Sequence, residues 1–128
     1  MKTYRLTFNM HELRSQASIS AFAGDTAVRL RITLSDGGNP YSIADGCAAI
    51  LSGTKADGNK LWNRCVIKGD TIIYDFTEQT ANCGGIVNCE ITLYGPDGRI
   101  VTAPKFIIVV DEREVSGDDV NLSESEYK

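Results

Sequence analysis

The sequence predicts a single all-β domain, an antiparallel β-sandwich of about seven to nine strands. Short segments of the chain alternate between apolar and polar residues, which is the period of a strand with one buried face. Turn signals rich in Gly, Asp and Asn recur between these segments, at the close spacing typical of sandwiches and barrels. No segment beyond the N-terminal region keeps a helical period, so there is no room for helical crossovers. The 128 residues are enough for one core.

The N-terminal third is expected to hold three strands. Residues 4–9 have β character, and residues 17–23 alternate weakly between small and apolar side chains. A turn at Gly24 and Asp25 then leads into the clearest strand, residues 26–34. The two sides of this strand are Val28, Leu30, Ile32 and Leu34 against Arg29, Arg31 and Thr33. The apolar side is expected to face the core.

The middle of the chain is expected to form a hairpin between residues 47–53 and 61–67. The dipeptide Asp57-Gly58 separates these strands, and both residues tolerate the positive φ angles of a type I′ turn. The second strand carries the only tryptophan, Trp62. Because large aromatic side chains are mostly buried, we expect Trp62 in the core.

The hairpin segment also lies close to a phosphate-binding pattern. Gly53 and Gly58 have the glycine spacing of G-x-x-x-x-G-K-[ST], but Asn59 intervenes before Lys60. The sequence that follows is strand-like, whereas a phosphate-binding loop precedes a helix whose N-terminus faces the phosphates. We therefore expect no nucleotide site and interpret the segment as a chain reversal.

Two further strands are expected between residues 71 and 94. In residues 71–76 the shared face holds Ile72, Tyr74 and Phe76. In residues 86–94 the inward set is Val87, Cys89, Ile91 and Leu93, and the outward set is Asn88, Glu90, Thr92 and Tyr94. Turns at Gly85 and at Asp97-Gly98 bound the second of these strands.

Residues 105–111, KFIIVVD, form the last expected strand and are apolar on both faces. This pattern indicates a central strand, or a strand whose outer face is covered by a partner. From residue 111 to 128 the chain holds seven acids and two bases, with few apolar groups. We therefore expect a β-sandwich domain over residues 1–112 and a flexible acidic tail or linker over residues 113–128.

Composition excludes several classes of protein. Residues 1–110 hold ten acids and eleven bases without a run of Lys or Arg, so nucleic-acid binding through a basic patch is not expected. No stretch approaches the roughly 20 apolar residues of a membrane-spanning helix, so no membrane partner is expected either. The N-terminus lacks the apolar region of an export signal. The chain is expected to stay in the cytoplasm or to leave it as part of a particle.

Residues able to carry chemistry are few. The cysteines at 47, 65, 83 and 89 form no C-x-x-C pair, and the single histidine, His11, is distant from them in sequence. We expect these thiols to be reduced and mostly buried, without a metal or a disulfide. Two carboxylates among Asp70, Asp75 and Glu78 could still meet to hydrolyse a glycoside. We nevertheless expect a protein that is not an enzyme, with no catalytic residue and no cofactor.

The aromatic residues enter two partial patterns. The order Cys47, Trp62, Cys89 echoes an antibody domain, but Val87 stands where that domain has a tyrosine. We therefore expect a sandwich that is immunoglobulin-like in architecture only. The second pattern is a possible sugar-binding platform formed by Trp62, Tyr41, Tyr74 and Tyr94. Tyr94 is its best candidate because it is expected on an outward face.

A set of turns and core positions between Ala21 and Asp111 resembles a known family. The set comprises Gly24-Asp25, Asn39-Pro40-Tyr41 with Ile43 and Gly46, Asp57-Gly58, Gly85 to Leu93, and Thr102 with Phe106, Val109 and Val110. In these positions the chain is similar to the N-terminal domain of BppU-like upper baseplate proteins of siphophages and prophages of Gram-positive bacteria. Members of that family usually continue into a long linker and further domains. We expect this chain to be a truncated member or a standalone adaptor.

The resemblance implies a β-sandwich that docks onto the hub of a tail baseplate. From it we expect a non-enzymatic structural adaptor of the virion tail, assembled in the cytoplasm of the bacterial host. Its expected partners are other tail proteins and further copies of itself. The residues expected on the interaction surface are Tyr94, Ile107 and Val109. The alternative is a carbohydrate-binding β-sandwich module that contributes to adhesion to the host surface.

Overall fold

The computed structural model describes residues 1–113, which form ten strands and no helix. In chain order the strands are β1 (Lys2–Asn9), β2 (Arg14–Phe22), β3 (Val28–Asp36), β4 (Asn39–Pro40), β5 (Ala48–Thr54), β6 (Lys60–Lys68), β7 (Thr71–Asp75), β8 (Gly85–Tyr94), β9 (Ile100–Thr102) and β10 (Lys105–Asp111). The all-β prediction is confirmed. Strands β4 and β9 were not expected, because two or three residues are too few to show an alternation.

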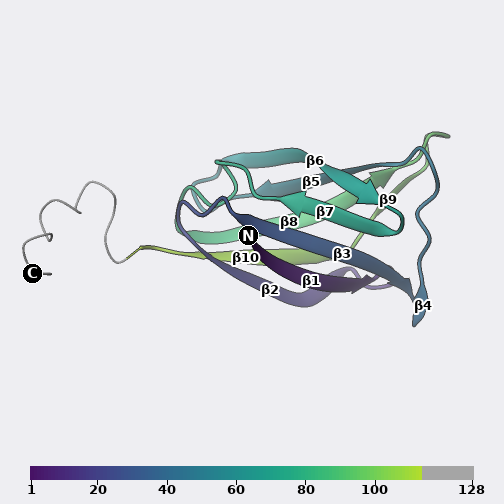
Figure 1. Ribbon diagram of the computed structural model, residues 1–128, viewed down its shortest axis with the longest axis horizontal. Coiled ribbons are helices and arrows are strands. Elements are labelled where there is room, and N and C mark those ends of the chain that lie inside the picture. Colours follow the sequence, from purple (N-terminus) through teal and green to yellow (C-terminus); the bar gives the residue numbers. More distant parts are fainter. Residues whose placement is uncertain (114–128) are drawn as a thin grey trace, which may run out of the picture.

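The strands form one sheet that curls until its two end strands approach each other (Figure 1). The order across the sheet is β1-β3-β7-β6-β5-β8-β10-β2, with β4 beside β3 and β9 beside β8. Strand β6 pairs with β7 in one layer and with β5 in the other, so it joins the two layers. Between β1 and β2, the Tyr4 hydroxyl donates to the Ser20 carbonyl at 2.9 Å. We call this junction the seam of a nearly closed barrel.

Two strand pairs are parallel, so the expected purely antiparallel sheet is wrong. Strand β1 runs parallel to β3, and β10 runs parallel to β2. Strands β1 and β2 are consecutive in the chain, yet they stand at the two ends of the strand order. Each of them therefore pairs with a strand that is not its hairpin neighbour, and such a strand can run in the same direction.

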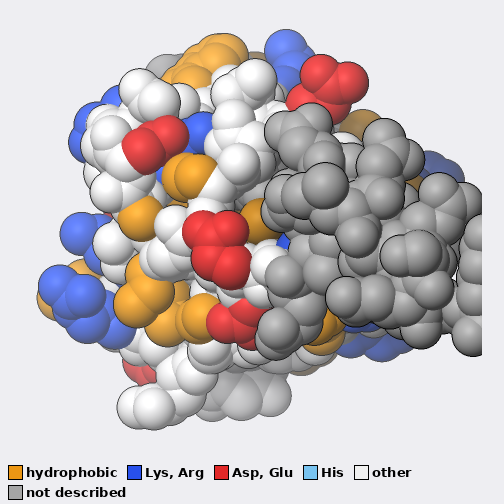
Figure 2. All heavy atoms as spheres, turned by 90° about the vertical axis from the view of Figure 1, so that its left-hand side faces the viewer, with side chains coloured by type: hydrophobic (Ala, Val, Ile, Leu, Met, Phe, Trp, Pro, Cys, Tyr) orange, Lys and Arg blue, Asp and Glu red, His pale blue; other side chains and the backbone are white. Residues whose placement is uncertain are grey.

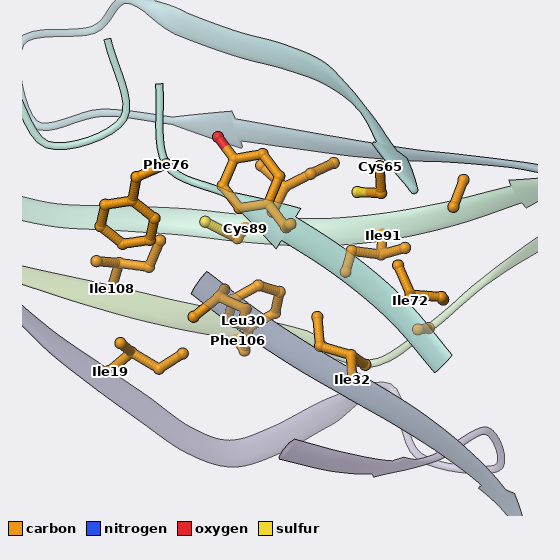
Figure 3. Close-up of a cluster of buried hydrophobic side chains, with 14 of the residues drawn as sticks. Ile19, Leu30, Ile32, Cys65, Ile72, Phe76, Cys89, Ile91, Phe106 and Ile108 are labelled. Atoms are coloured by element: carbon orange, nitrogen blue, oxygen red, sulfur yellow. The ribbon is translucent and has the colours of Figure 1, made fainter. Parts of the chain in front are cut away.

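The core lies between the two layers and is filled by inward-facing side chains (Figure 3). Leu30 and Ile32 of β3 are fully buried, as the alternation in residues 26–34 predicts. They face Phe106 and Ile108 of β10, and the rings of Phe8 and Phe106 lie 5.3 Å apart. Each such side chain contributes about 1.5–3 kcal/mol to the free energy of unfolding through its burial. The packing of the two layers is therefore the main source of stability.

The hairpin at Asp57 and Gly58 joins β5 to β6 as expected, but its turn is not type I′. A type I′ turn needs positive φ at two residues, and here only Gly58 has it, at 85°. The Gly58 N–H donates to the Lys55 carbonyl, and the Asn59 N–H donates to the Asp57 carboxylate, both at 2.9 Å. The loop is therefore a type I turn followed by a glycine with positive φ.

Strand β10 is a central strand, because β8 and β2 pair with it on its two sides. This agrees with the first of the two interpretations of the apolar segment at residues 105–111. Residues 114–128 lie outside the described part of the chain, so the predicted tail and its boundary stay predictions. Within the described part, no helix is long and apolar enough to span a membrane.

Candidate interaction surface

The outer face of β1, β3 and β7 carries polar side chains, and two pairs of them are bonded to each other. Arg29 donates two hydrogen bonds to the Asp75 carboxylate, with N–O distances of 2.7 and 3.0 Å. These bonds from Arg29 hold the pKa of Asp75 below its usual value. The hydroxyls of Thr7 and Thr33 lie 2.9 Å apart. We call this surface the polar face.

The outer face of β2, β10 and β8 carries apolar side chains instead. Phe22 is 52% exposed and Ile86 is 48% exposed, and two half-buried residues of β10, Ile107 and Val109, share their face. Val109 lies directly opposite Ile86 in the ladder between β10 and β8. We call Phe22, Ile86, Ile107 and Val109 the apolar strip. Two of the three residues expected at the interaction surface therefore lie within one patch.

Beside the apolar strip, the same layer is hollowed into a groove of about 690 Å³. Residues of β2, β5, β6, β8 and β10 line it. Its charged side chains are Arg14, Lys60 and Lys105, with a single acid, Glu90. The groove is therefore a positively charged concavity next to an apolar surface.

Trp62 lines the groove and is 68% exposed, so its predicted place in the core is wrong. Leu61 and Cys65 take the buried positions of β6. Because side chains alternate across a strand, Trp62 must point to the opposite face. The alternation along residues 61–65 was a signal that could have placed this residue correctly.

The aromatic residues do not come together as a single platform. Tyr74 is buried, and its hydroxyl lies 2.7 Å from that of Thr80; burial raises the pKa of Tyr74 to about 12. Tyr94 is 40% exposed and lies opposite Ile100 at the far end of β8. Tyr94 lies six positions along β8 from Asn88, which pairs with Ile107, and six positions of a strand span about 20 Å. The structure therefore separates Tyr94 from the apolar strip.

One outward position of β8 also differs from the prediction. Thr92, expected on the outward face, is only 8% exposed. Strand β9 covers this end of β8, and the Thr92 hydroxyl lies 3.2 Å from that of Thr102. The unexpected short strand is the reason for this burial.

Three of the expected turns meet at one end of the barrel. Gly85 has φ of 119°, and a Cβ there would lie 2.4 Å from that of Ala56, so only glycine fits. The Gly24 N–H donates to the Ala81 carbonyl at 2.7 Å, and Asp25 accepts a hydrogen bond from Arg113 at 3.2 Å. Figure 2 views this end, where acidic and apolar side chains are mixed.

The fourth expected turn, at Asp97 and Gly98, lies at the opposite end and joins β8 to β9. Gly98 has φ of 86°, and its N–H donates to the Gly95 carbonyl at 3.1 Å. The Asp97 carboxylate accepts from the Arg99 N–H at 3.1 Å. This hairpin therefore has the same construction as the one at Asp57 and Gly58.

The candidate acids do not converge on a cleft. Asp70 and Asp75 flank the two ends of β7, and Asp70 accepts a hydrogen bond from the Ile43 N–H at 3.0 Å. Within residues 1–113, no three potential metal ligands lie together. Burial raises the pKa of the Cys65 and Cys89 thiols to about 12, which makes them poor nucleophiles.

Comparison with known families decides between the remaining classes of protein. The chain matches the family model described as the BppU N-terminal domain over residues 2–127. The chain belongs to this family. The resemblance found in its turns and core positions is thereby confirmed. Since BppU is a phage baseplate protein, membership supports a structural component of a phage tail.

The fold of the chain is also similar to that of a solved phage domain. The N-terminal domain of phage TP901-1 ORF48 matches with a TM-score of 0.69 at 13% identity, covering 87% of this chain and 99% of that chain. At this identity the match shows a shared fold. CopC from Methylosinus trichosporium OB3b matches with a TM-score of 0.49 at 15% identity, covering 79% and 90%. The curated protein sequences contain no match.

Proposed function

We propose that this BppU domain is a non-enzymatic adaptor that docks onto other tail proteins through the apolar strip. The observation that carries the proposal is the outward exposure of Phe22 and Ile86 beside Ile107 and Val109. Burying such side chains against a partner removes apolar surface from water, which favours association. On the polar face, by contrast, Arg29 and Asp75 already pair with each other.

The surroundings of the strip also fit an interface between proteins. Ser18 and Ser20 of β2 lie opposite Ile107 and Val109, and Asp111 lies opposite Phe22. Protein interfaces commonly have an apolar, charge-poor centre within a polar rim. The partner is therefore a protein surface with an apolar patch of its own, rather than a nucleic acid or a membrane.

Self-association and location complete the proposal. Tail assemblies are symmetric, so several copies of the domain would be held at equivalent positions, in contact with one another or with a common hub. The protein would be found in the virion tail after assembly in the host cytoplasm. For the architecture, we propose an immunoglobulin-like sandwich: the two packed layers support this description, with β6 as the strand that links them.

Cross-linking of assembled tail particles tests the docking surface. Lys105 lies on the outer face of the layer that carries the strip, whereas Lys2 and Lys68 belong to the layer of the polar face. We expect amine-reactive cross-links from Lys105 to other tail proteins, and few from Lys2 or Lys68. Absence of the protein from purified particles would contradict the structural role. Cross-links from Lys2 and Lys68 alone would contradict the docking surface.

A second candidate function, carbohydrate binding, is favoured by the exposed indole of Trp62 in the groove. Exposed aromatic rings stack on sugars through their apolar faces. Binding to a glycan array that is lost in Trp62→Ala, and retained in Tyr94→Ala, would support it. The two variants are distinguishable because Trp62 and Tyr94 lie on different strands.

A further inference from the structure

The outer face of one layer arranges its side chains in rows that cross the strands. Strands β6, β5, β8, β10 and β2 lie next to one another in this order. One row follows paired positions through all of them: Lys60, Thr54, Asn88, Ile107 and Ser18. Every member of this row lines the groove of about 690 Å³. Because paired strands lie about 4.8 Å apart, the row is about 19 Å long, which suits a chain-like ligand.

A second row places an aromatic ring at one side of the groove. Trp62 of β6 pairs with Ser52 of β5, which pairs in turn with Glu90 of β8. The indole is 68% exposed, and beside it Ser52 and Gly53 line the groove with a small side chain and with none. A flat ligand can therefore lie against the indole without meeting a large side chain. Sugar rings are such ligands, because their C–H groups form an apolar face.

Positive charge lies at both sides of the groove. Lys60 is two residues from Trp62 and on the same face of β6, and Arg14 of β2 pairs with Lys105 of β10. The one acid in the lining is Glu90. Among residues 1–113, none of the three basic side chains takes part in an ion pair. On a chain whose net charge is −4, this groove therefore favours a ligand that carries negative charge.

The middle of the groove offers hydrogen-bonding groups that suit sugar hydroxyls. The Asn88 side chain both donates and accepts, Ser52 adds a hydroxyl, and the Glu90 carboxylate only accepts. A sugar hydroxyl can donate to Glu90. A bare polyanion such as polyphosphate has no hydrogen to donate, and the charge of Glu90 would repel it. The lining therefore favours a ligand that combines hydroxyls with a moderate negative charge.

The pairing of the strands disfavours an extended peptide in the same groove. Peptides that bind to sheets commonly add a strand to an open edge. The strands that cross the middle of the groove, β5, β8 and β10, are each paired on both sides. Their main-chain groups are bonded within the sheet, so a ligand must be bound by side chains. A saccharide needs no open edge of a sheet.

We propose that the groove binds an acidic saccharide, a chain of sugar rings that bear carboxylates. One ring stacks on Trp62, and its carboxylate pairs with Lys60. The carboxylate of a later unit pairs with Arg14 and Lys105, and hydroxyls between the two units bond to Asn88. The proposal rests on the second candidate function, carbohydrate binding, and needs no partner on the apolar strip.

Calorimetric titration with two matched probes tests the charge of the ligand. The probes are a short oligogalacturonate and the same oligomer with its carboxylates methyl-esterified. We expect the acid to bind about ten-fold more tightly than the ester, because hydrogen bonds to charged groups are the stronger ones. Equal affinities would overturn the preference for an acid and leave carbohydrate binding intact. No binding of either probe, or of hyaluronan and alginate fragments, would overturn both.

Charge-neutral variants locate the contacts of the saccharide. The pair Arg14→Gln and Lys105→Gln is expected to weaken binding of the oligogalacturonate by about ten-fold. The matched pair Arg5→Gln and Arg31→Gln, in the ladder between β1 and β3, is expected to leave binding unchanged. Because Arg14 and Lys105 are exposed, the circular dichroism and Tm of the first pair should match those of the unmodified chain. No weakening by the first pair, or equal weakening by both, would overturn the proposal.

Trp62 reports on the ligand in the unmodified protein, because it is the only tryptophan of the chain. Saturation with oligogalacturonate is expected to reduce the quenching of its fluorescence by acrylamide, since a stacked sugar ring covers the indole. Binding without any reduction of quenching would place the saccharide elsewhere on the protein and would overturn the proposal.

Two other acidic polymers distinguish a saccharide from other occupants of the groove. An oligoglutamate carries carboxylates on a peptide, and a short oligodeoxythymidylate carries phosphates and bases. We expect both to bind more weakly than the oligogalacturonate. Tighter binding of the first would assign the groove to an acidic peptide, and tighter binding of the second would assign it to a nucleic acid. Either result would overturn the proposal.

Discussion

The polar face and the apolar strip belong to the same curled sheet, yet their outward side chains differ: those of the first are polar and partly paired, and those of the second are apolar. On the polar face, Arg29 is paired with Asp75 and Thr7 with Thr33. On the other layer, Val109 lies opposite Ile86 across two strands, where Ile86 is 48% exposed and Val109 is half-buried. This difference is why we propose the apolar strip, and not the polar face, as the docking surface.

The largest expected effect comes from placing a charge in the centre of the apolar strip. Val109→Asp should abolish incorporation of the protein into tail particles, because an unpaired carboxylate would be buried against the partner. Thr33→Asp places the same group on the polar face and should leave incorporation intact. Immunoblots of purified particles measure both. Normal incorporation of a folded Val109→Asp protein would contradict the proposal that the apolar strip is the docking surface.

The second prediction contrasts the inner and outer sides of one strand. Ile108 is fully buried, so Ile108→Ala should lower the free energy of unfolding by about 2–5 kcal/mol. Ile107 is one residue away and half-buried, so Ile107→Ala should lower the free energy of unfolding by about 1 kcal/mol or less. Urea denaturation measures both values. Equal losses would mean that the outer face of β10 is part of the core rather than a docking surface.

The third prediction concerns the seam, where β1 and β2 lie near each other but are not paired as strands. Tyr4→Phe removes the hydrogen bond to the Ser20 carbonyl and should cost about 0.5–1 kcal/mol of unfolding free energy. Hydrogen exchange of β1 and β2 amides should rise, while exchange in β8 should stay unchanged. Unchanged exchange in all three strands would indicate that the seam is held by packing alone.

The smallest expected effect lies on the polar face and depends on pH. The pKa of Asp75 is lower in the folded chain than in the unfolded chain because of Arg29, so the ion pair stabilises the fold above the unfolded pKa, about 3.9. This stabilisation disappears as pH falls through the lowered folded value. Asp75→Asn should therefore reduce Tm at pH 7 by about 1–3 °C, and the difference should vanish in acid.

Calorimetry between pH 7 and pH 2 measures this difference. Arg29→Gln should give a similar loss at pH 7, and the double variant should add little to either single one, because both remove the same pair. A loss that stays constant down to the lowest pH would point to packing of Asp75 instead of its charge.

The sequence predicted the strands well, because alternation is a local property of the chain. The period of residues 26–34 was enough to assign the buried face of β3, which the structure confirms. The pairing of β10 with β2 could not be predicted, since it joins residues about ninety positions apart and no local signal sets its register. Trp62 was misplaced because its size outweighed the alternation of its own strand.

In the candidate site, too, some residues could be recognised from local sequence patterns and others could not. Ile107 and Val109 were singled out from the doubly apolar pattern of one strand, and both lie on the outer face of β10. Phe22 and Ile86, which complete the apolar strip, come from two other strands, and their own segments gave no reason to single them out. Tyr94 was expected on the outward face of β8 and is exposed, but its distance from the strip depends on the fold of the whole sheet.

The central position of β10 has a mechanical consequence. Both of its edges are bonded, to β2 on one side and to β8 on the other. A pull applied at Arg113 along the strand would load these two ladders in shear, so that many hydrogen bonds bear the force together. An edge strand peeled sideways would instead lose its bonds one after another. Tension applied at Arg113 would therefore be borne by two strand ladders at once.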